Sequence, residues 1–382
     1  MKEILPSRTA EILVTQKCNL NCSYCFEKHK NGKSLDFTEF RKHLGDGVLP
    51  FESFYIFGGE PTLNMKFIED AVEWITHNPK WDDEYKRKLT HSICSNLITN
   101  GVALEGIIPI LKRYHIGLQI SLDGPEDIND ACRKDHAGNG HFQQIMHNIE
   151  LCKENGIPYT IHGAIAKNNY KNFSRIVEWF LQMALENPVY RNDINMLENV
   201  FRNNFAQIVF EDDITDEDID IFLKELYNAV KLILETPLLN DYSIHTRKRI
   251  AVGLLNRRGG ICSAGQTMFS YDESFRAFPC HRMTTNEVRH PLLSLDEENG
   301  HKPDWSGYKL YQDVARGHVM YGAFYDNHDF QGGAYFVNWC PVTNMEVSGD
   351  PFYLPPKHNV LIAELQRFVP QLAEYFDLNL AM

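Results

Sequence analysis

Three cysteine residues lie close together near the start of the chain, at Cys18, Cys22 and Cys25. Three thiolates at this C-x3-C-x2-C spacing can wrap one corner of a cubane iron–sulfur cluster, although a [4Fe–4S] cluster normally takes four cysteine ligands. No fourth cysteine follows nearby in the sequence. One iron of such a cluster would therefore be open to a small molecule, as open metal sites are.

Two other interpretations of this cysteine loop (residues 18–25) stay open. A structural zinc site usually has two paired C-x2-C elements, and the second pair is missing from the sequence. Cysteines that only fill a core are a further possibility, but Asn and Ser surround these three. The loop directly follows the first expected strand, and this position favours a cluster.

A second motif, Gly58-Gly59-Glu60-Pro61, follows the next expected strand. Two glycines at a strand end let backbone groups approach a ligand closely. The Glu60 carboxylate can accept hydrogen bonds from a cationic ammonium group, a charge-assisted contact. The alternative is a tight turn before a helix, with Pro61 near the first helical position.

The elements that position these motifs alternate from about residue 10 to residue 210. Apolar or β-branched runs predict strands at 11–15, 53–57, 92–99, 116–121, 159–166 and 206–210. Amphipathic stretches predict helices at 37–44, 65–76, 104–114, 142–155 and 173–185. This alternation predicts an α/β fold with parallel pairing, as an open sheet or a partial barrel. In either arrangement, sites gather at the carboxyl ends of the strands.

Composition limits the other possibilities. The chain has 382 residues, enough for two or three domains, and 38 basic against 51 acidic residues give a net charge of −13. This balance disfavours duplex nucleic acid as a main partner. We find no signal peptide and no apolar run long enough for a membrane span, so we expect a cytoplasmic protein. The chain has nine cysteines, an odd number, and three of them crowd into residues 18–25, which in a reducing compartment points to metal or catalysis rather than disulfides.

The second half of the chain differs from the first in composition and periodicity. Residues 211–258 are acidic and helical, and we interpret them as a solvated connecting helix. After residue 259 the chain is rich in aromatic residues, Gly and Pro. Residues 311–356 have little periodicity, and a segment this long without regular structure needs another source of order, which a bound metal would supply. An amphipathic helix is expected at 360–376. The predicted domains are therefore 1–210, 211–258 and 259–382.

The cysteine loop, with Tyr24 before its last cysteine, and the Gly58-Gly59-Glu60-Pro61 motif together resemble the radical S-adenosylmethionine (SAM) enzymes. The resemblance implies a partial (β/α)6 barrel of the TIM type in which Cys18, Cys22 and Cys25 hold a [4Fe–4S] cluster. The amino and carboxylate groups of SAM would chelate the fourth iron. An electron from the cluster would then cleave SAM to methionine and a 5′-deoxyadenosyl radical, which abstracts hydrogen from the substrate.

Further strand ends extend the resemblance. It implies that Ser121, at the end of the fourth strand, and Arg133 lie near the ribose and carboxylate of SAM. Asn100, after the third strand, is carried over to the same cofactor site. An ordinary turn is the alternative for the Asp123-Gly124-Pro125 segment. The remaining cysteines of the first half match no ligand position and are interpreted as packing residues: Cys94, Cys132 and Cys152.

A second set of cysteines comprises Cys262, Cys280 and Cys340, and the aromatic residues between the first two suit a hairpin. By spacing alone these are three unrelated thiols or one zinc site. The segments around these cysteines resemble the SPASM or shorter twitch domain of radical SAM peptide maturases, including the anaerobic sulfatase-maturing type. That domain typically carries seven cysteines and binds two auxiliary clusters, whereas this sequence keeps only three of the cysteines. The resemblance therefore implies one auxiliary cluster with three cysteine ligands, or a degenerate domain without a cluster.

One departure concerns His281, which stands where sulfatase maturases place an aspartate after the second of these cysteines. Its imidazole can act as a base or ligate iron. The resemblance implies an enzyme that modifies a peptide or protein, as in maturation of ribosomally made peptides, with a one-electron donor such as flavodoxin or ferredoxin. Little chain precedes the first strand, so we expect no N-terminal module that grips a leader peptide. The alternatives are a radical SAM enzyme acting on a small molecule or nucleotide, and a non-catalytic zinc-binding module.

Overall fold

The computed structural model describes most of the first two thirds of the chain and its last helix. The described residues are 9–27, 32–44, 52–191, 193, 195, 197, 200–201, 207–209, 214–255, 268–274, 276–278, 280–284, 293–296, 300–303 and 356–380. The chain divides into two compact units. The first comprises Met1–Ser121, Lys134–Thr160 and Ser263–Gly317, and the second comprises Leu122–Arg133, Ile161–Cys262 and His318–Met382.

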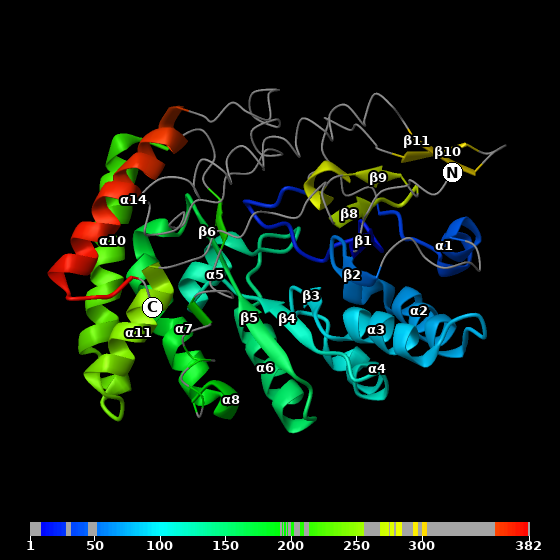
Figure 1. Ribbon diagram of the computed structural model, residues 1–382, viewed down its shortest axis with the longest axis horizontal. Coiled ribbons are helices and arrows are strands. Elements are labelled where there is room, and N and C mark those ends of the chain that lie inside the picture. The colour runs from blue at the N-terminus through cyan, green and yellow to red at the C-terminus, as the bar shows by residue number, and fades with distance from the viewer. Residues whose placement is uncertain are drawn as a thin grey trace. The chain divides into compact units, whose positions relative to one another are not determined.

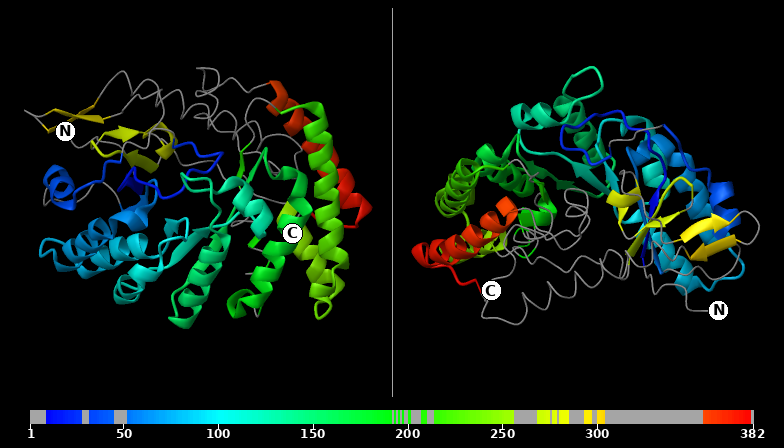
Figure 2. Two further views of the ribbon diagram at one scale, coloured as in Figure 1. Left: turned by 180° about the vertical axis from the view of Figure 1, so that it is seen from behind. Right: turned by 90° about the horizontal axis from the view of Figure 1, so that it is seen from above.

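A six-stranded sheet forms one part of the first unit, in the order β11-β10-β9-β8-β1-β2. Strand β1 (Thr9–Leu13) pairs in parallel with β2 (Ser53–Phe57) on one side and with β8 (Met268–Tyr271) on the other. Strands β8, β9 (Ala277–Phe278), β10 (Leu293–Asp296) and β11 (Gly300–Pro303) follow in antiparallel pairs. Both views of Figure 2 show β8 and β9 (yellow) beside β1 (blue).

A three-stranded sheet has the order β3-β4-β5, and its strands are β3 (Leu97–Thr99), β4 (Leu118–Ser121) and β5 (Tyr159–His162). Strands β3 and β4 are parallel, with Ile98 opposite Gln119. In the second unit, β6 (Ala164–Ala166) pairs in parallel with β7 (Gln207–Val209). The predicted α/β class with parallel pairing is therefore confirmed (Figure 1).

The helices of the first unit are α1 (Phe37–Leu44), α2 (Met65–His77), α3 (Asp83–Cys94), α4 (Ile108–Arg113) and α6 (Phe142–Glu154). Helix α2 buries a face with helical spacing, including Phe67, Ile68, Val72 and Ile75. Asp82 caps the start of α3, because its carboxylate accepts a hydrogen bond from the Tyr85 N–H at 2.8 Å. Short 3-10 helices precede α2 and α4, at Pro61–Asn64 and Glu105–Ile107.

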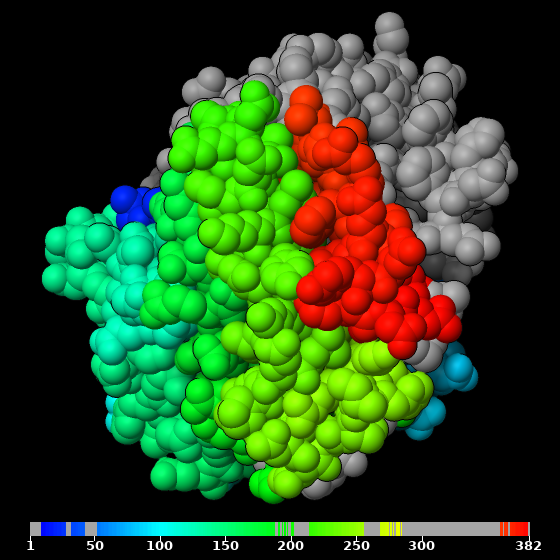
Figure 3. All heavy atoms as spheres, turned by 90° about the vertical axis from the view of Figure 1, so that its left-hand side faces the viewer, coloured from blue at the N-terminus to red at the C-terminus, as the bar shows by residue number. Residues whose placement is uncertain are grey.

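The second unit is mainly helical, with α5 (Glu126–Cys132), α7 (Phe173–Glu186), α8 (Pro188–Arg191), α10 (Asp216–Glu235), α11 (Ile244–Leu255) and α14 (Pro356–Tyr375). Shorter 3-10 helices lie at Tyr170–Asn172 and Pro237–Leu239 in this unit, and at His281–Thr284 in the first. Helix α14 contributes a buried stripe of Leu361, Leu365, Val369 and Leu372 to one hydrophobic core shared with α7, α10 and α11. Figure 3 shows α14 (red) lying against α10 and α11 (green).

Helix α10 corrects one expectation. It is helical as predicted and begins with a capping box between Thr215 and Asp218. It is not a solvated connector, because Phe222, Leu226 and Val230 are fully buried in the core of the second unit. Of the acidic residues that prompted the solvated interpretation, Asp216 and Glu217 lie in its first turn, where they complement the helix dipole, and residues 212–213 lie outside the described residues. The predicted domain boundaries after residues 210 and 258 stay predictions.

Other expected elements agree with the structure to within a few residues, with three differences. Residues 92–94 belong to the last turn of α3, so the third strand is shorter than predicted. The run 159–166 is divided at Gly163, where a Cβ atom would come within 2.6 Å of the Leu122 carbonyl oxygen. Helices α3 and α5 were not predicted, because their sequences are largely polar. Residues 311–355, expected to depend on a metal for order, lie outside the described residues.

Among the described helices, none combines the length and apolar character that crossing a membrane requires.

Candidate active site

The cysteine loop leaves the sheet directly after β1. Its entrance is fixed by Thr15, whose hydroxyl contacts the Ser34 hydroxyl at 2.8 Å and accepts a hydrogen bond from the Lys17 N–H at 3.1 Å. Within the loop, the Cys25 N–H donates to the Cys22 carbonyl at 3.1 Å, which forms a tight turn between these two predicted ligands. The thiols of Cys18, Cys22 and Cys25 form no disulfide among the described residues and are partly exposed.

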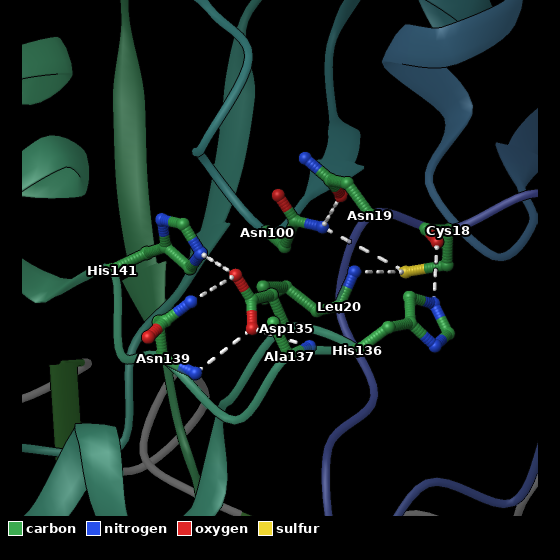
Figure 4. A network of polar contacts seen from close by, with 9 residues as sticks. All are labelled: Cys18, Asn19, Leu20, Asn100, Asp135, His136, Ala137, Asn139 and His141. Carbon is green, nitrogen blue, oxygen red and sulfur yellow. Dashed lines mark hydrogen bonds and ion pairs between the residues drawn. The ribbon is translucent and has the colours of Figure 1, made fainter.

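Two N–H groups point at the sulfur of Cys18. The Leu20 backbone N–H lies 3.4 Å from this sulfur, and the side-chain Nδ2 of Asn100 lies 3.8 Å from it. The same Nδ2 donates to the Asn19 side-chain oxygen at 2.6 Å (Figure 4). The structure thus brings Asn100, predicted to line the cofactor site, to the cysteine loop from the end of β3.

A second segment, residues 134–141, clasps the cysteine loop from the other side. The Asn21 N–H donates to the Lys134 carbonyl at 2.6 Å, Leu20 forms a β-bridge with Asp135, and His136 Nε2 donates to the Cys18 carbonyl at 3.1 Å. Figure 4 shows how His136 reaches the loop. Sequence reasoning missed this clasp, because two of its three contacts use backbone groups that any residue provides.

Asp135 organises the clasp. Its carboxylate accepts hydrogen bonds from the N–H groups of Ala137 and Asn139, each at 2.8 Å, and from His141 Nε2 at 3.1 Å (Figure 4). These bonds, those from Asn139 first, hold the pKa of Asp135 well below its ordinary value. The segment is therefore shaped by an ionised carboxylate before any ligand binds.

The two glycines of the second motif pack against the start of the cysteine loop. The Gly59 N–H donates to the Thr15 carbonyl at 2.8 Å, and the Glu60 N–H donates to the Lys17 carbonyl at 2.7 Å. A Cβ atom at Gly58 would lie 2.5 Å from the Thr15 oxygen, and one at Gly59 would lie 2.4 Å from the Lys17 oxygen. Only glycine permits this approach between the end of β2 and the loop.

The Glu60 carboxylate ties the ends of β2 and β3 together and is only 1% exposed. One of its oxygens accepts from the hydroxyls of Thr62 and Thr99, both at 2.7 Å, and the other accepts from the Asn100 N–H at 2.7 Å. Burial raises the pKa of Glu60, against the effect of these hydrogen bonds. The tight-turn alternative describes the local geometry, since Glu60 caps the 3-10 helix that begins at Pro61. Contact of Glu60 with an ammonium group stays a prediction.

Ser121 and Arg133 belong to different units. Ser121 ends β4 in the first unit and is partly exposed. Arg133 follows α5 in the second unit, where its Nε lies 3.1 Å from a carboxylate oxygen of Asp123. That oxygen also accepts from the Ala164 N–H at 2.9 Å. The expected contacts of Ser121 and Arg133 with SAM stay predictions, as does the role of Tyr24, which is partly exposed.

His281 lies beside residues that border the cysteine loop and the Gly58-Gly59-Glu60-Pro61 motif. Sequence reasoning did not anticipate this position. Its Nδ1 lies 3.0 Å from a carboxylate oxygen of Glu11 on β1, and its ring packs against Phe26 and Phe57 with centroid distances of 5.3 and 5.4 Å. Phe26 follows Cys25, and Phe57 precedes Gly58. Burial acts to raise the pKa of Glu11, but the contacts with His281 and the hydrogen bond from Ser270 outweigh burial and hold this pKa below its ordinary value. The sequence signal that could have indicated this contact was Glu11, an acidic residue within β1.

The second cysteine set is only partly described. Cys280 is buried in the first unit, whereas Cys262 and Cys340 lie outside the described residues, so the auxiliary cluster stays a prediction. The hairpin expected between the first two of these cysteines is confirmed by the antiparallel pairing of β8 and β9. The packing role predicted for Cys94, Cys132 and Cys152 agrees with their burial.

The donor chemistry of the cysteine loop fits an iron–sulfur cluster. Three thiols outside any disulfide on one loop, two N–H groups directed at sulfur, and a backbone cradle of glycines match what such clusters take from a protein. No set of three or more His, Cys, Asp or Glu side chains in the described part of the chain is gathered closely enough for a single metal ion.

Comparison with known families matches the first part of the chain. Residues 12–180 match the model of the radical SAM superfamily and so form a radical SAM domain. The matched span begins in β1 and includes the cysteine loop, Glu60, Asn100 and Arg133. The match confirms the predicted resemblance to the radical SAM enzymes, a superfamily that uses SAM and a [4Fe–4S] cluster.

Two named relatives show the range of similar proteins. The radical SAM cyclopropyl synthase TigE of Paramaledivibacter caminithermalis is 23% identical over 254 residues, which is 58% of this chain and 48% of TigE. The cysteine-type anaerobic sulfatase-maturating enzyme of Clostridium perfringens is 26% identical over 224 residues, 55% of this chain and 56% of that enzyme. The chain thus matches about half the length of these curated relatives.

A solved structure covers nearly the whole chain. The structure of native anSMEcpe with bound AdoMet and Cp18Cys peptide is similar over 97% of this chain and 98% of its own, with a TM-score of 0.62 and 16% identity. At this identity the likeness shows the fold alone. The predicted partial (β/α)6 barrel is consistent with it, while the degenerate auxiliary domain stays a prediction.

Proposed function

We propose that this protein is a radical SAM enzyme that abstracts hydrogen from a peptide or protein substrate during its post-translational modification. The observation that carries the proposal is the cysteine loop, whose three thiols lie on a segment held between the Gly58–Pro61 turn and residues 134–141. The names of the similar proteins support a peptide substrate, since one is a sulfatase-maturating enzyme and one structure holds a bound peptide.

The roles of the chain's own residues follow from this proposal. Cys18, Cys22 and Cys25 would bind the cluster, and the Glu60, Ser121 and Arg133 side chains would bind SAM. The bound cofactors supply one-electron cleavage of SAM and the 5′-deoxyadenosyl group that takes hydrogen from the substrate. The backbone contacts of Gly59 and Glu60 fix the loop, so the cluster would assemble on a largely preformed surface.

His281 has two possible roles in the proposal. Since its Nδ1 faces Glu11, its Nε2 is the nitrogen that can accept a proton from the substrate or ligate the auxiliary cluster. The auxiliary cluster itself would be held by Cys262, Cys280 and Cys340. We further propose a cytoplasmic enzyme that receives electrons from a donor such as flavodoxin or ferredoxin.

The test is anaerobic reconstitution followed by iron counting and measurement of 5′-deoxyadenosine formed from SAM. Roughly eight irons per chain are expected for two clusters, and about four if the second cysteine set is empty. Cys22→Ala should abolish 5′-deoxyadenosine formation, because three thiolates are needed to hold the cluster. Cys94→Ala is the matched control, since this buried thiol lies outside the loop. Continued SAM cleavage by Cys22→Ala would contradict the ligand assignment.

A further inference from the structure

Asn100 is held in one orientation at the sulfur of Cys18. Its backbone N–H donates to Glu60 at 2.7 Å, and its side-chain Oδ1 accepts from the Val102 N–H at 3.0 Å. Because Oδ1 is engaged by a donor, the amide cannot be flipped without placing its NH2 group against the Val102 N–H. The NH2 group therefore faces the cysteine loop.

Both hydrogens of this NH2 group have acceptors on the loop. The Asn19 side-chain oxygen lies 2.6 Å from Nδ2, and the Cys18 sulfur lies 3.8 Å from it. The Leu20 N–H approaches the same sulfur at 3.4 Å. The sulfur of Cys18 thus faces two N–H dipoles, one from the backbone and one from a side chain that other residues hold in place.

We propose that Asn100 is a positioning residue that tunes the reduction potential of the [4Fe–4S] cluster by donating an N–H···S hydrogen bond to Cys18. The inference rests on the proposed function, because it requires the cluster at Cys18, Cys22 and Cys25. Hydrogen bonds to ligand sulfur stabilise the more negative, reduced cluster and so raise its potential. The electron comes from the donor protein, or from dithionite in a titration.

The proposal gives Glu60 a second role. Its carboxylate receives the Asn100 N–H on one oxygen and the Thr62 and Thr99 hydroxyls on the other, so it anchors the residue that faces the sulfur. Removal of the Asn100 side chain leaves that backbone anchor intact. A change in cluster potential in an Asn100 variant is then attributable to the side-chain N–H.

Asn148 provides a matched control on the same turn. Its Nδ2 donates to the carbonyls of Gly101 and Val102 at 2.8 and 3.0 Å, so these two bonds support residues 101–102 and do not reach the cysteine loop. Asn148→Ala removes both of these hydrogen bonds to the turn. Asn100→Asp keeps an oxygen that can accept from Val102 but replaces the N–H donor with a charged acceptor.

The experiment is an anaerobic, mediator-assisted redox titration of the reconstituted full chain, followed by electron paramagnetic resonance of the reduced cluster. At the wild-type midpoint, Asn100→Ala should lower the ratio of reduced to oxidised cluster by about threefold to tenfold, the equilibrium factor of one net hydrogen bond. Asn100→Asp should lower it further. Asn148→Ala should leave the ratio within about twofold of wild type.

Three results would overturn the inference. One is an unchanged ratio in Asn100→Ala, and another is an equal shift in Asn148→Ala. If Asn100→Ala holds no iron, Asn100→Ser and Asn100→Asp are titrated in its place. The third result is that none of these three Asn100 variants holds a cluster while Asn148→Ala does, which would assign Asn100 to cluster assembly instead of tuning of the potential. A wild-type chain that takes up no cluster would refute the proposed function itself, which is a distinct outcome.

Discussion

The buried ion pair between Arg133 and Asp123 makes the strongest quantitative prediction. Asp123 is fully buried and Arg133 is 8% exposed, with 3.1 Å between Nε and the carboxylate oxygen. At that distance two unit charges attract by roughly 5 kcal/mol for an effective dielectric constant of about 20. Desolvation of both groups offsets much of this attraction, so the pair as a whole contributes little net stability.

Breaking the pair from one side is nevertheless expensive, because the remaining charge stays buried. We expect Arg133→Met to lower the free energy of unfolding by about 3–5 kcal/mol, and Asp123→Asn by about 3 kcal/mol. The double variant leaves no isolated charge, so its loss should be smaller than the sum of the two single losses by about 2–3 kcal/mol.

Urea denaturation of the cofactor-free protein, followed by circular dichroism, measures all four corners of this cycle. The control is the pair of Arg175 and Asp127 in the same unit, which has a similar distance of 2.9 Å but side chains 52% and 61% exposed. Its coupling should be below about 1 kcal/mol. An Arg133–Asp123 coupling no larger than that of the exposed pair would refute the assignment of Arg133 to a buried structural pair.

Two further predictions concern buried polar groups elsewhere. Gln16 is fully buried, and neither atom of its amide has a hydrogen-bond partner among the described residues, so Gln16→Met should raise the free energy of unfolding by about 1–2 kcal/mol in urea. A loss of stability would show that the amide has a partner, such as a buried water. Tyr170 donates to Asp218, and this bond lowers the pKa of Asp218 to about 2. Its contribution is therefore full above the ordinary pKa of 3.8 and is lost as pH falls from about 4 to 2, so acid titration of stability over that range should be flatter in Asp218→Asn.

The sequence was sufficient to locate the candidate site where chemistry coincides with chain geometry. Cysteine spacing, the Gly58-Gly59 pair and Asn100 all mark strand ends, and parallel strands bring such ends to one edge. The contacts that shape the loop were not predictable in the same way. The segment of residues 134–141 meets the loop mainly through backbone groups, and backbone hydrogen bonds leave no trace in side-chain identity.

The position of His281 shows why long-range pairing limits prediction from sequence. Strand β8 pairs with the free edge of β1, and the hairpin that follows carries His281 to Glu11, although 270 positions separate the two residues. Periodicity identifies each strand but does not identify its partner. Once β8 is placed beside β1, an imidazole expected in a separate auxiliary domain becomes a neighbour of Phe26 and Phe57, which flank the cysteine loop and the glycine pair. A residue assigned by resemblance to the second cysteine set can therefore act at the first.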